Sequence, residues 1–279
     1  MTKRSEQTFK IEEITPLDKA IKLVIKGKEY LVSKSFYTDN YFYPDKEIEP
    51  QELAEIKEAD RLLKAEMYLE KLLSNKRYTV KEVKDKLRGN YDLKDKEISD
   101  LMRPYLESHI LSDKDYASDY LEAKSSSGYG LDYISDRLRT KGINLKEVLS
   151  KEEIAPYEKI AEEKVSLLLS KKDDLSKPKP AREKQLTTYL ITRGFTLSES
   201  KRLVTAHLER QSPESEEKAA LLQEKKLSTL ADKYYLFYKR KETDEYKLKS
   251  KLISKLLSLG YSTSVIYAII TKKGYFNHD

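Results

Sequence analysis

One pattern recurs along this chain of 279 residues and constrains its fold more than any other feature. An apolar helical run ends in a leucine, three residues follow, and a glycine then precedes an aromatic or aliphatic residue. The complete copies are Leu138–Gly142–Ile143, Leu190–Gly194–Phe195 and Leu256–Gly260–Tyr261, and a degenerate first copy has Leu87 and Tyr91 with its glycine displaced to Gly89. The four leucines lie 51, 52 and 66 residues apart. This spacing predicts one helical unit copied four times, each copy burying its apolar face partly against its neighbours.

Local signals mark where the helices of each unit begin and end. Three hydroxyl residues precede a glutamate at capping-box spacing, namely Thr79–Glu82, Ser150–Glu153 and Thr196–Glu199. The glycines of the complete copies suit the left-handed residue that closes a helix. Because a further helix precedes each such pair, the sequence predicts an elongated, mostly α-helical solenoid of three-helix repeats. We place these repeats at residues 51–108, 109–158, 159–213 and 214–279, with Lys171–Pro180 as a long, charged loop inside the third.

The first 50 residues have a different pattern. Ile21, Leu23 and Ile25 alternate with other residues, and Lys26–Lys28 forms a glycine-centred turn before another short strand. The pattern predicts a small three-stranded antiparallel sheet over residues 1–50, followed by a short helix at Ser35–Phe42. Four aromatic residues near that helix are expected to cover the core of the sheet rather than to stack on bases, namely Tyr37, Tyr41, Phe42 and Tyr43.

Positive charge is concentrated in the last two repeats. The chain carries a net charge of +6, and residues 151–279 hold 26 basic and 19 acidic side chains. Such a region attracts an acidic polymer or an acidic groove in another protein, but lysine-rich helices can also simply be soluble. Charge alone leaves these readings open.

Several classes of protein are disfavoured by what the sequence lacks. It has no cysteine, so disulfides and thiolate metal sites are excluded. It has neither an apolar N-terminal segment nor an apolar run near the ~20 residues that cross a membrane. We therefore predict a soluble, cytoplasmic protein without a membrane partner.

Signals for catalysis are also missing. The histidines His109, His207 and His278 show no metal-ligand spacing, and no phosphate-binding loop of the common nucleotide-hydrolase type is present. Gly128–Gly130 lacks the third glycine of a dinucleotide site, and Asp113 is expected to cap the helix that carries Tyr116 and Ala117. The sequence predicts no enzyme, no metal and no cofactor.

Basic residues mixed with aromatic residues form the better candidate site. They cluster at Lys233–Lys241, continue through Lys247, Lys249, Lys251 and Lys255, and recur at Arg137, Arg139 and Lys141. Lysine and arginine neutralise phosphates, and tyrosines stack on bases. We expect Tyr235 and Phe237 to be packing residues, while Tyr234 and Tyr238 remain open. The same surface would suit an acidic protein groove.

A family resemblance rests on three segments in the middle of the chain. Ile110–Tyr120 contains a leucine-x-aspartate before a tyrosine-alanine step, Gly128–Gly130 is a glycine-x-glycine, and Ile134–Ile143 ends in leucine-arginine-x-lysine-glycine-isoleucine. In this order they resemble the signature of the RecX family of RecA regulators. The resemblance extends over nearly the whole chain. It departs from the family pattern at Tyr91, which stands where a glycine is expected, and in the loop Lys171–Pro180.

The resemblance implies a non-enzymatic modulator of RecA with roles in DNA repair, homologous recombination and the SOS response. RecX proteins bind RecA along the groove of its filament on single-stranded DNA and restrain its ATPase, strand-exchange and coprotease activities. Many also bind DNA. Gly128, Gly130 and Gly142 match as backbone-shaping residues, and we expect a monomer. Arg137, Arg139 and Lys141 match the basic helix end of the family pattern. Arg193 takes the corresponding place in the third repeat. The candidate contact residues of the fourth repeat are Lys233, Lys239, Arg240, Lys247 and Lys249. A DNA-binding helical repeat protein without a RecA target is the alternative.

Overall fold

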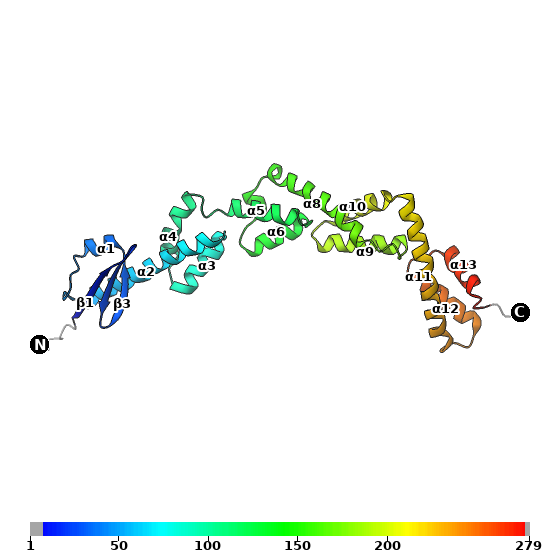
Figure 1. The fold of residues 1–279 in the computed structure, drawn as a ribbon, viewed down its shortest axis with the longest axis horizontal. Coiled ribbons are helices and arrows are strands. Elements are labelled where there is room, and N and C mark those ends of the chain that lie inside the picture. Colours follow the sequence, from blue (N-terminus) through cyan, green and yellow to red (C-terminus); the bar gives the residue numbers. More distant parts are fainter. Residues whose placement is uncertain (1–7, 277–279) are drawn as a thin grey trace. The chain divides into compact units, whose positions relative to one another are not determined.

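The computed structural model describes residues 8–276, and in this range it contains thirteen helices and four strands (Figure 1). The chain forms two compact units. The first runs to Ala117 and includes Thr140–Ile143, and the second holds Ser118–Arg139 and the described chain from Asn144 onward. No helix within residues 8–276 combines the length and apolar character needed to cross a bilayer.

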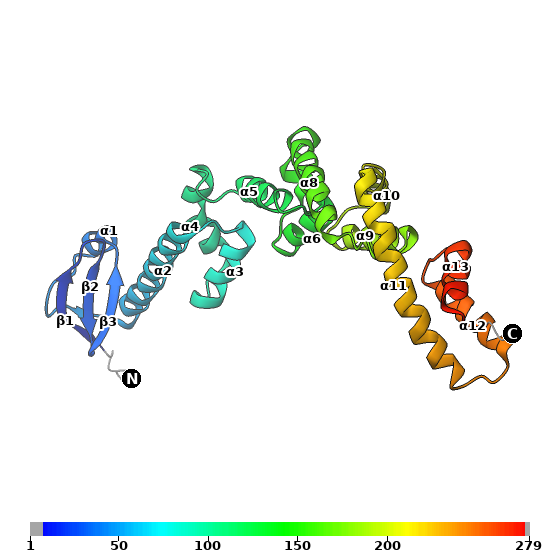
Figure 2. The same cartoon turned by 45° about the vertical axis from the view of Figure 1, so that its right-hand side comes forward.

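The N-terminal sheet has four antiparallel strands in the order β3-β2-β1-β4, of which β1, β2 and β3 lie side by side in Figure 2. The strands are β1 (Phe9–Pro16), β2 (Ile21–Ile25), β3 (Lys28–Val32) and β4 (Glu47–Ile48). The predicted hairpin is confirmed, because Lys26 and Gly27 both take positive φ angles of 49° and 70° in its two-residue turn. The prediction of only three strands was wrong. Two residues of β4 pair with the start of β1, an edge contact too short to leave an alternating pattern.

The predicted short helix is present as α1 (Lys34–Asp39). Phe42 is buried with the apolar face of β2, whereas Tyr41 and Tyr43 are 82% and 58% exposed. The expectation that all four aromatic residues cover the core was therefore wrong for these two. Tyr41 takes a left-handed φ of 48° just after α1, so the helical spacing used to group the rings no longer applies there.

Helix α2 (Pro50–Asn75) belongs to two cores. Its first half buries Leu53 and Ile56 against the sheet, and its second half buries Leu69 with α3 (Val80–Tyr91) and α4 (Asp95–Glu107). Helix α2 also occupies one amide of the edge strand β3, because the Leu31 amide donates to Asp60 Oδ1 at 2.6 Å. A paired edge amide is unavailable for pairing with another chain.

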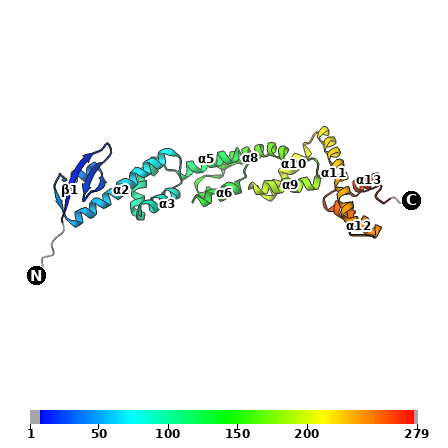
Figure 3. The same cartoon turned by 60° about the horizontal axis from the view of Figure 1, so that its bottom comes forward.

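The repeated unit is a long helix followed by two shorter ones. After α2–α4 come α5 (Asp113–Ser125), α6 (Leu131–Thr140) and the one-turn α7 (Leu145–Val148). The third group comprises α8 (Lys151–Lys172), α9 (Lys179–Thr192) and α10 (Leu197–Glu209), of which α9 and α10 lie side by side in Figure 3. The fourth comprises α11 (Pro213–Lys239), α12 (Glu245–Ser258) and α13 (Thr263–Lys273). Helix α8 crosses the predicted boundary between residues 158 and 159 without a break.

The predicted helix starts and stops are confirmed. Capping boxes open α3, α8 and α10, at Thr79, Ser150 and Thr196. The repeat glycines take left-handed φ angles, 86° at Gly142, 85° at Gly194 and 92° at Gly260. In the degenerate first copy Asp92 takes this conformation instead, with φ 49°.

Two local predictions need correction. The irregular segment in the third repeat is confined to residues 173–178, because α8 continues to Lys172 and α9 already begins at Lys179. Asp113 does not cap its own helix. Its Oδ1 accepts a hydrogen bond from the Val80 amide at the start of α3, at 2.9 Å, while Ser112 Oγ accepts from the Asp115 amide. Burial raises the pKa of Asp113, and the hydrogen bond from Val80 opposes this effect.

Candidate interaction surfaces

The repeat glycines bring successive repeats into direct backbone contact. In the second unit, the Gly130 amide donates to the Arg193 carbonyl at 2.8 Å and the Asp132 amide donates to the Gly194 carbonyl at 3.1 Å. A Cβ atom on Gly130 would lie 2.3 Å from the Gly194 carbonyl oxygen. The turn before α10 thus lies in direct contact with the start of α6. The contact requires glycine at both positions, because a side chain at either one would clash.

The first unit contains a similar contact, in which side-chain atoms approach the glycine turn. Thr79 Oγ1, at the start of α3, donates to the Lys141 carbonyl at 2.9 Å. A Cβ atom on Gly142 would lie 2.7 Å from Lys81 Cδ. In both contacts, the residue before the repeat glycine supplies the accepting carbonyl, and the start of the middle helix of another repeat supplies the donor.

Arg193 is held inside one of these contacts. Its guanidinium donates through Nη1 to the carbonyls of Ser127 and Gly128 at 3.1 and 3.2 Å, and through Nε to Tyr189 Oη at 2.8 Å. It also lies over the Tyr129 ring, 4.4 Å from the centroid. The positive charge of Arg193 is therefore used to fasten α9 to the segment before α6.

We predict that Arg193→Ala lowers the free energy of unfolding by about 2 kcal/mol, because it removes hydrogen bonds from a charged donor. Chemical denaturation monitored by circular dichroism would measure this change. Arg139→Ala is the control, since an exposed arginine contributes within about 0.5 kcal/mol. Equal stabilities of the two variants would contradict the structural role of Arg193.

Lys141 is also engaged within its own unit. Its ammonium group forms a 2.5 Å ion pair with Glu82 and lies 5.4 Å from the centroid of the Tyr116 ring. The hydrogen bond with Glu82 raises the pKa of Lys141, although burial opposes it. The Glu82 carboxylate meanwhile belongs to the capping box of α3. Lys141 thus links the glycine turn after α6 to helix α3.

Arg137 and Arg139, the other two basic residues predicted at the end of α6, face solvent. Arg139 has a side chain that is 78% exposed and pairs with Asp136, three residues earlier on α6. Such exposed pairs contribute little to stability and can exchange partners. Arg137 is exposed and lies 5.2 Å from the centroid of the Tyr133 ring, which in turn stacks on Tyr129. Both arginines therefore present positive charge on α6.

The candidate residues of the fourth repeat lie on the packed pair α11 and α12. On α11, Lys233 and Lys239 lie 5.7 and 5.3 Å from the centroids of the Tyr234 and Tyr235 rings, and Arg240 follows the helix end. On α12, Lys247 lies 3.8 Å from Asp244, and Lys249 lies 5.7 Å from the centroid of the Phe276 ring. Four of these cations are exposed to solvent, and Lys249 is half-buried.

The aromatic residues of α11 differ in their packing. Tyr235 stacks on Tyr275 at 4.3 Å and donates its hydroxyl to the Tyr275 carbonyl, so the packing prediction is confirmed for Tyr235. The same prediction was wrong for Phe237, which is 49% exposed. Two residues along an α-helix correspond to about 200°, so Phe237 lies on the side opposite Tyr235. Phe237 instead lines an open hollow with Lys233, Tyr234, Leu236 and Arg240.

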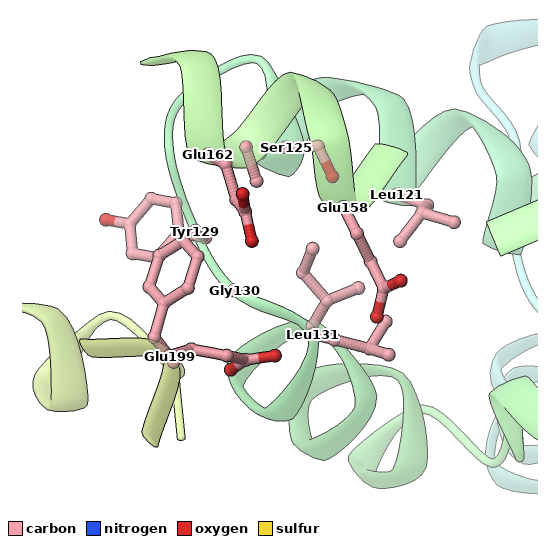
Figure 4. Close-up of a pocket in the computed structure, with 11 residues that line it drawn as sticks. Leu121, Ser125, Tyr129, Gly130, Leu131, Glu158, Glu162 and Glu199 are labelled. Atoms are coloured by element: carbon pink, nitrogen blue, oxygen red, sulfur yellow. The ribbon is translucent and has the colours of Figure 1, made fainter. Parts of the chain in front are cut away.

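A small pocket between α8 and the starts of α6 and α10 has the wrong properties for a substrate site. Figure 4 shows Glu158, Glu162 and Glu199 around it, together with Tyr129 and Leu131. Its volume of about 20 Å³ is enough for only one water molecule. Glu162 pairs with Arg202 and Glu199 belongs to the capping box of α10. Within residues 8–276, no group of three histidine or carboxylate side chains is placed to hold a metal ion.

A buried polar cluster was missed by the sequence analysis. Asp173 accepts two hydrogen bonds from Arg182, at 2.6 and 2.5 Å, and lies 3.1 Å from His207 Nε2 and 2.8 Å from Gln211 Nε2. The side chains of Asp173 and Arg182 are only 3% and 5% exposed. Burial alone would raise the pKa of Asp173, but the hydrogen bonds from Arg182 and His207 outweigh it and lower this pKa. The only signal in the sequence was an acidic residue inside an assumed loop. Of the other histidines, His109 lies in the turn after α4 and His278 lies outside the described residues.

Comparisons with known proteins agree on one relationship. The chain is 30% identical to the regulatory protein RecX of Streptococcus gordonii over 73% of this chain and 75% of that protein. It is 30% identical to the regulatory protein RecX of Streptococcus sanguinis over 70% and 72% of the two chains. A solved structure described as regulatory protein RecX matches with a TM-score of 0.52 at 21% identity, over 71% of this chain and 99% of that one, and so shares the fold. No family model matches the sequence.

Proposed function

Because this chain belongs to the RecX family, we propose that it binds RecA in the groove of the RecA filament on single-stranded DNA and mainly inhibits RecA. The inhibited activities would be ATP hydrolysis, strand exchange and coprotease action. The identity to proteins named as regulatory RecX, over about three quarters of both chains, is the observation that carries this proposal. The exposed cations of α6, α11 and α12 support it, since a nucleoprotein filament presents phosphates and carboxylates.

We assign the candidate residues two different tasks. Arg137 and Arg139 on α6 would contact the filament directly, as would the candidate cations of the fourth repeat, namely the exposed Lys233, Lys239, Arg240 and Lys247 and the half-buried Lys249. Lys141 and Arg193 would act indirectly, by holding repeats together through the contacts described above. We expect the protein to act in the cytoplasm as a monomer.

The proposed mechanism is occupation of the filament groove. A chain of several repeats that bridges neighbouring RecA protomers would keep the homologous duplex and the repressor out of the same groove. It would also act below one copy per RecA, because one chain spans several protomers. No catalytic group is required for this mechanism.

Titration of RecA's ATP hydrolysis on single-stranded DNA at two DNA concentrations tests the proposal. We expect inhibition at substoichiometric amounts of this protein, unchanged by extra DNA. The alternative is a DNA-binding helical repeat protein without a RecA target, which the hollow lined by Lys233, Tyr234 and Arg240 favours. It predicts inhibition that extra DNA relieves in proportion and DNA affinity that falls steeply with salt.

Charge reversal at Arg139 tests the proposed surface. We expect Arg139→Glu to raise the concentration needed for half-inhibition of RecA about tenfold, because an attractive contact becomes repulsive. Arg103→Glu is a matched control, since Arg103 on α4 is also exposed and also pairs with an aspartate three residues earlier, Asp100. If both variants inhibit RecA as the unmodified protein does, Arg139 is not part of the surface.

A further inference from the structure

The contact between the third and fourth repeats is built differently from the two tight contacts. Gly260 is the repeat glycine here, and a Cβ atom on it would lie 3.7 and 3.8 Å from the Cβ atoms of Pro178 and Ala181. These are ordinary van der Waals distances, whereas the corresponding Cβ atoms on the repeat glycines Gly142 and Gly194 would clash. Within the described residues, the start of α9 therefore approaches this glycine turn without a backbone hydrogen bond to it.

Two prolines explain the looser approach. In the tight contact of the second unit, the donating amides belong to Gly130, just before α6, and to Asp132, its second residue. The equivalent positions at the start of α9 are Pro178 and Pro180, and proline has no N–H to donate. The Leu259 carbonyl, which is the counterpart of the Arg193 carbonyl, receives no donor within the described part of the chain.

A groove of about 620 Å³ is present at this loosened contact. This volume lies in the range of about 300–1,000 Å³ that is typical of binding sites. Its wall is mostly apolar and comes from the start of α9, from α11 and from the turn before α13, through Pro178, Ala181, Leu230, Tyr234, Leu259 and Tyr261.

The charged side chains that line the groove are all basic. Lys177, Lys184 and Lys226 line it, and no carboxylate does so. Lys177 and Lys226 are held in place by Asp174, at 3.7 and 3.4 Å, while Lys184 is exposed. Three lysines against the one carboxylate of Asp174 leave the groove with a positive balance, which favours a negatively charged ligand.

We propose that this groove binds an acidic segment of another protein that carries an apolar anchor side chain. The anchor would occupy the apolar wall between Ala181 and Leu230, carboxylates on either side would face the lysines, and a backbone N–H of the segment would donate to the Leu259 carbonyl. A nucleic acid fits less well, because Tyr261 is only 6% exposed and Tyr234 is then the one partly exposed ring in the groove wall on which a base could stack. The proposal does not depend on which protein supplies the segment.

Fluorescence anisotropy with the full-length chain and a labelled synthetic peptide tests this site. The probe is a short peptide in which glutamates and aspartates flank one phenylalanine and one leucine. We expect saturable binding that the double variant Lys184→Glu/Thr188→Glu weakens at least about tenfold, since it places two carboxylates in the groove. Both residues are exposed, and Lys184→Glu alone serves if the double variant unfolds.

Three comparisons make the outcome decisive. Lys201→Glu, at an exposed position of α10 outside the groove, is expected to leave the affinity unchanged. A peptide with serine in place of phenylalanine and leucine is expected not to bind. Absence of saturable binding, equal binding of the serine peptide, or no effect of the double variant would overturn the proposal. Weaker oligothymidylate binding by the double variant, with unchanged peptide binding, would instead make the groove a nucleic-acid subsite and also overturn it.

Discussion

Gly130→Ala is expected to lower the free energy of unfolding of the second unit by about 3 kcal/mol. The added methyl group would lie 2.3 Å from the Gly194 carbonyl oxygen and 2.8 Å from the Phe195 amide. Both neighbours are backbone atoms, so relief requires the glycine turn to move away from α6. That movement breaks the hydrogen bonds from the Gly130 and Asp132 amides to the Arg193 and Gly194 carbonyls.

Denaturant unfolding followed by circular dichroism measures this effect, and Gly89→Ala provides the control. Gly89 lies on the exposed side of α3, and a Cβ atom there would meet no atom within 4 Å. This substitution is expected to stabilise the first unit by about 0.5–1 kcal/mol, because alanine loses less entropy than glycine in a helix. The two glycine-to-alanine changes should thus have opposite signs. An unchanged stability of Gly130→Ala would show that the repeats are not in backbone contact.

Asp173→Asn is expected to lower the free energy of unfolding by about 3–5 kcal/mol, since removing one partner leaves a buried charge without compensation. Arg182, with a side chain that is 5% exposed, would lose its carboxylate, and His207 and Gln211 would lose their shared acceptor. The neighbouring Asp174→Asn is the control. Asp174 is 38% exposed and pairs with Lys177 and Lys226, so its loss should cost under about 1 kcal/mol. Similar effects of the two substitutions would refute a special role for Asp173.

The buried pair also predicts a pH dependence. The pKa of Asp173 is lower in the folded protein than its usual value, because hydrogen bonds from Arg182 and His207 outweigh the effect of burial. A lowered folded pKa contributes stability above the unfolded pKa of about 4 and loses it as the pH falls through the folded value. The unmodified protein should therefore lose more unfolding free energy below about pH 4 than Asp173→Asn does. Parallel pH profiles of the two proteins would contradict this explanation.

The sequence by itself determined the local units of the fold. The capping boxes at Thr79, Ser150 and Thr196 and the left-handed glycines at Gly142, Gly194 and Gly260 lie where their patterns placed them. The hairpin turn at Lys26 and Gly27 is a further case. Each of these features depends on a few neighbouring residues, because capping and turn hydrogen bonds close over three to five positions. The family signature is equally local in the chain.

Only the tertiary structure decided which partners these units find. Asp113 was assigned to its own helix but accepts a hydrogen bond from Val80, 33 residues away. Asp173 lay in an assumed loop, yet its partners come from α9, from α10 and, at Gln211, from the segment that follows α10. Arg193 matched a binding residue but donates to carbonyls 65 and 66 positions earlier in the chain. The sequence gives the type of a charged residue but not whether its side chain faces solvent or a buried hydrogen-bond partner. The choice depends on how distant segments pack, because burial makes an unpaired polar group costly.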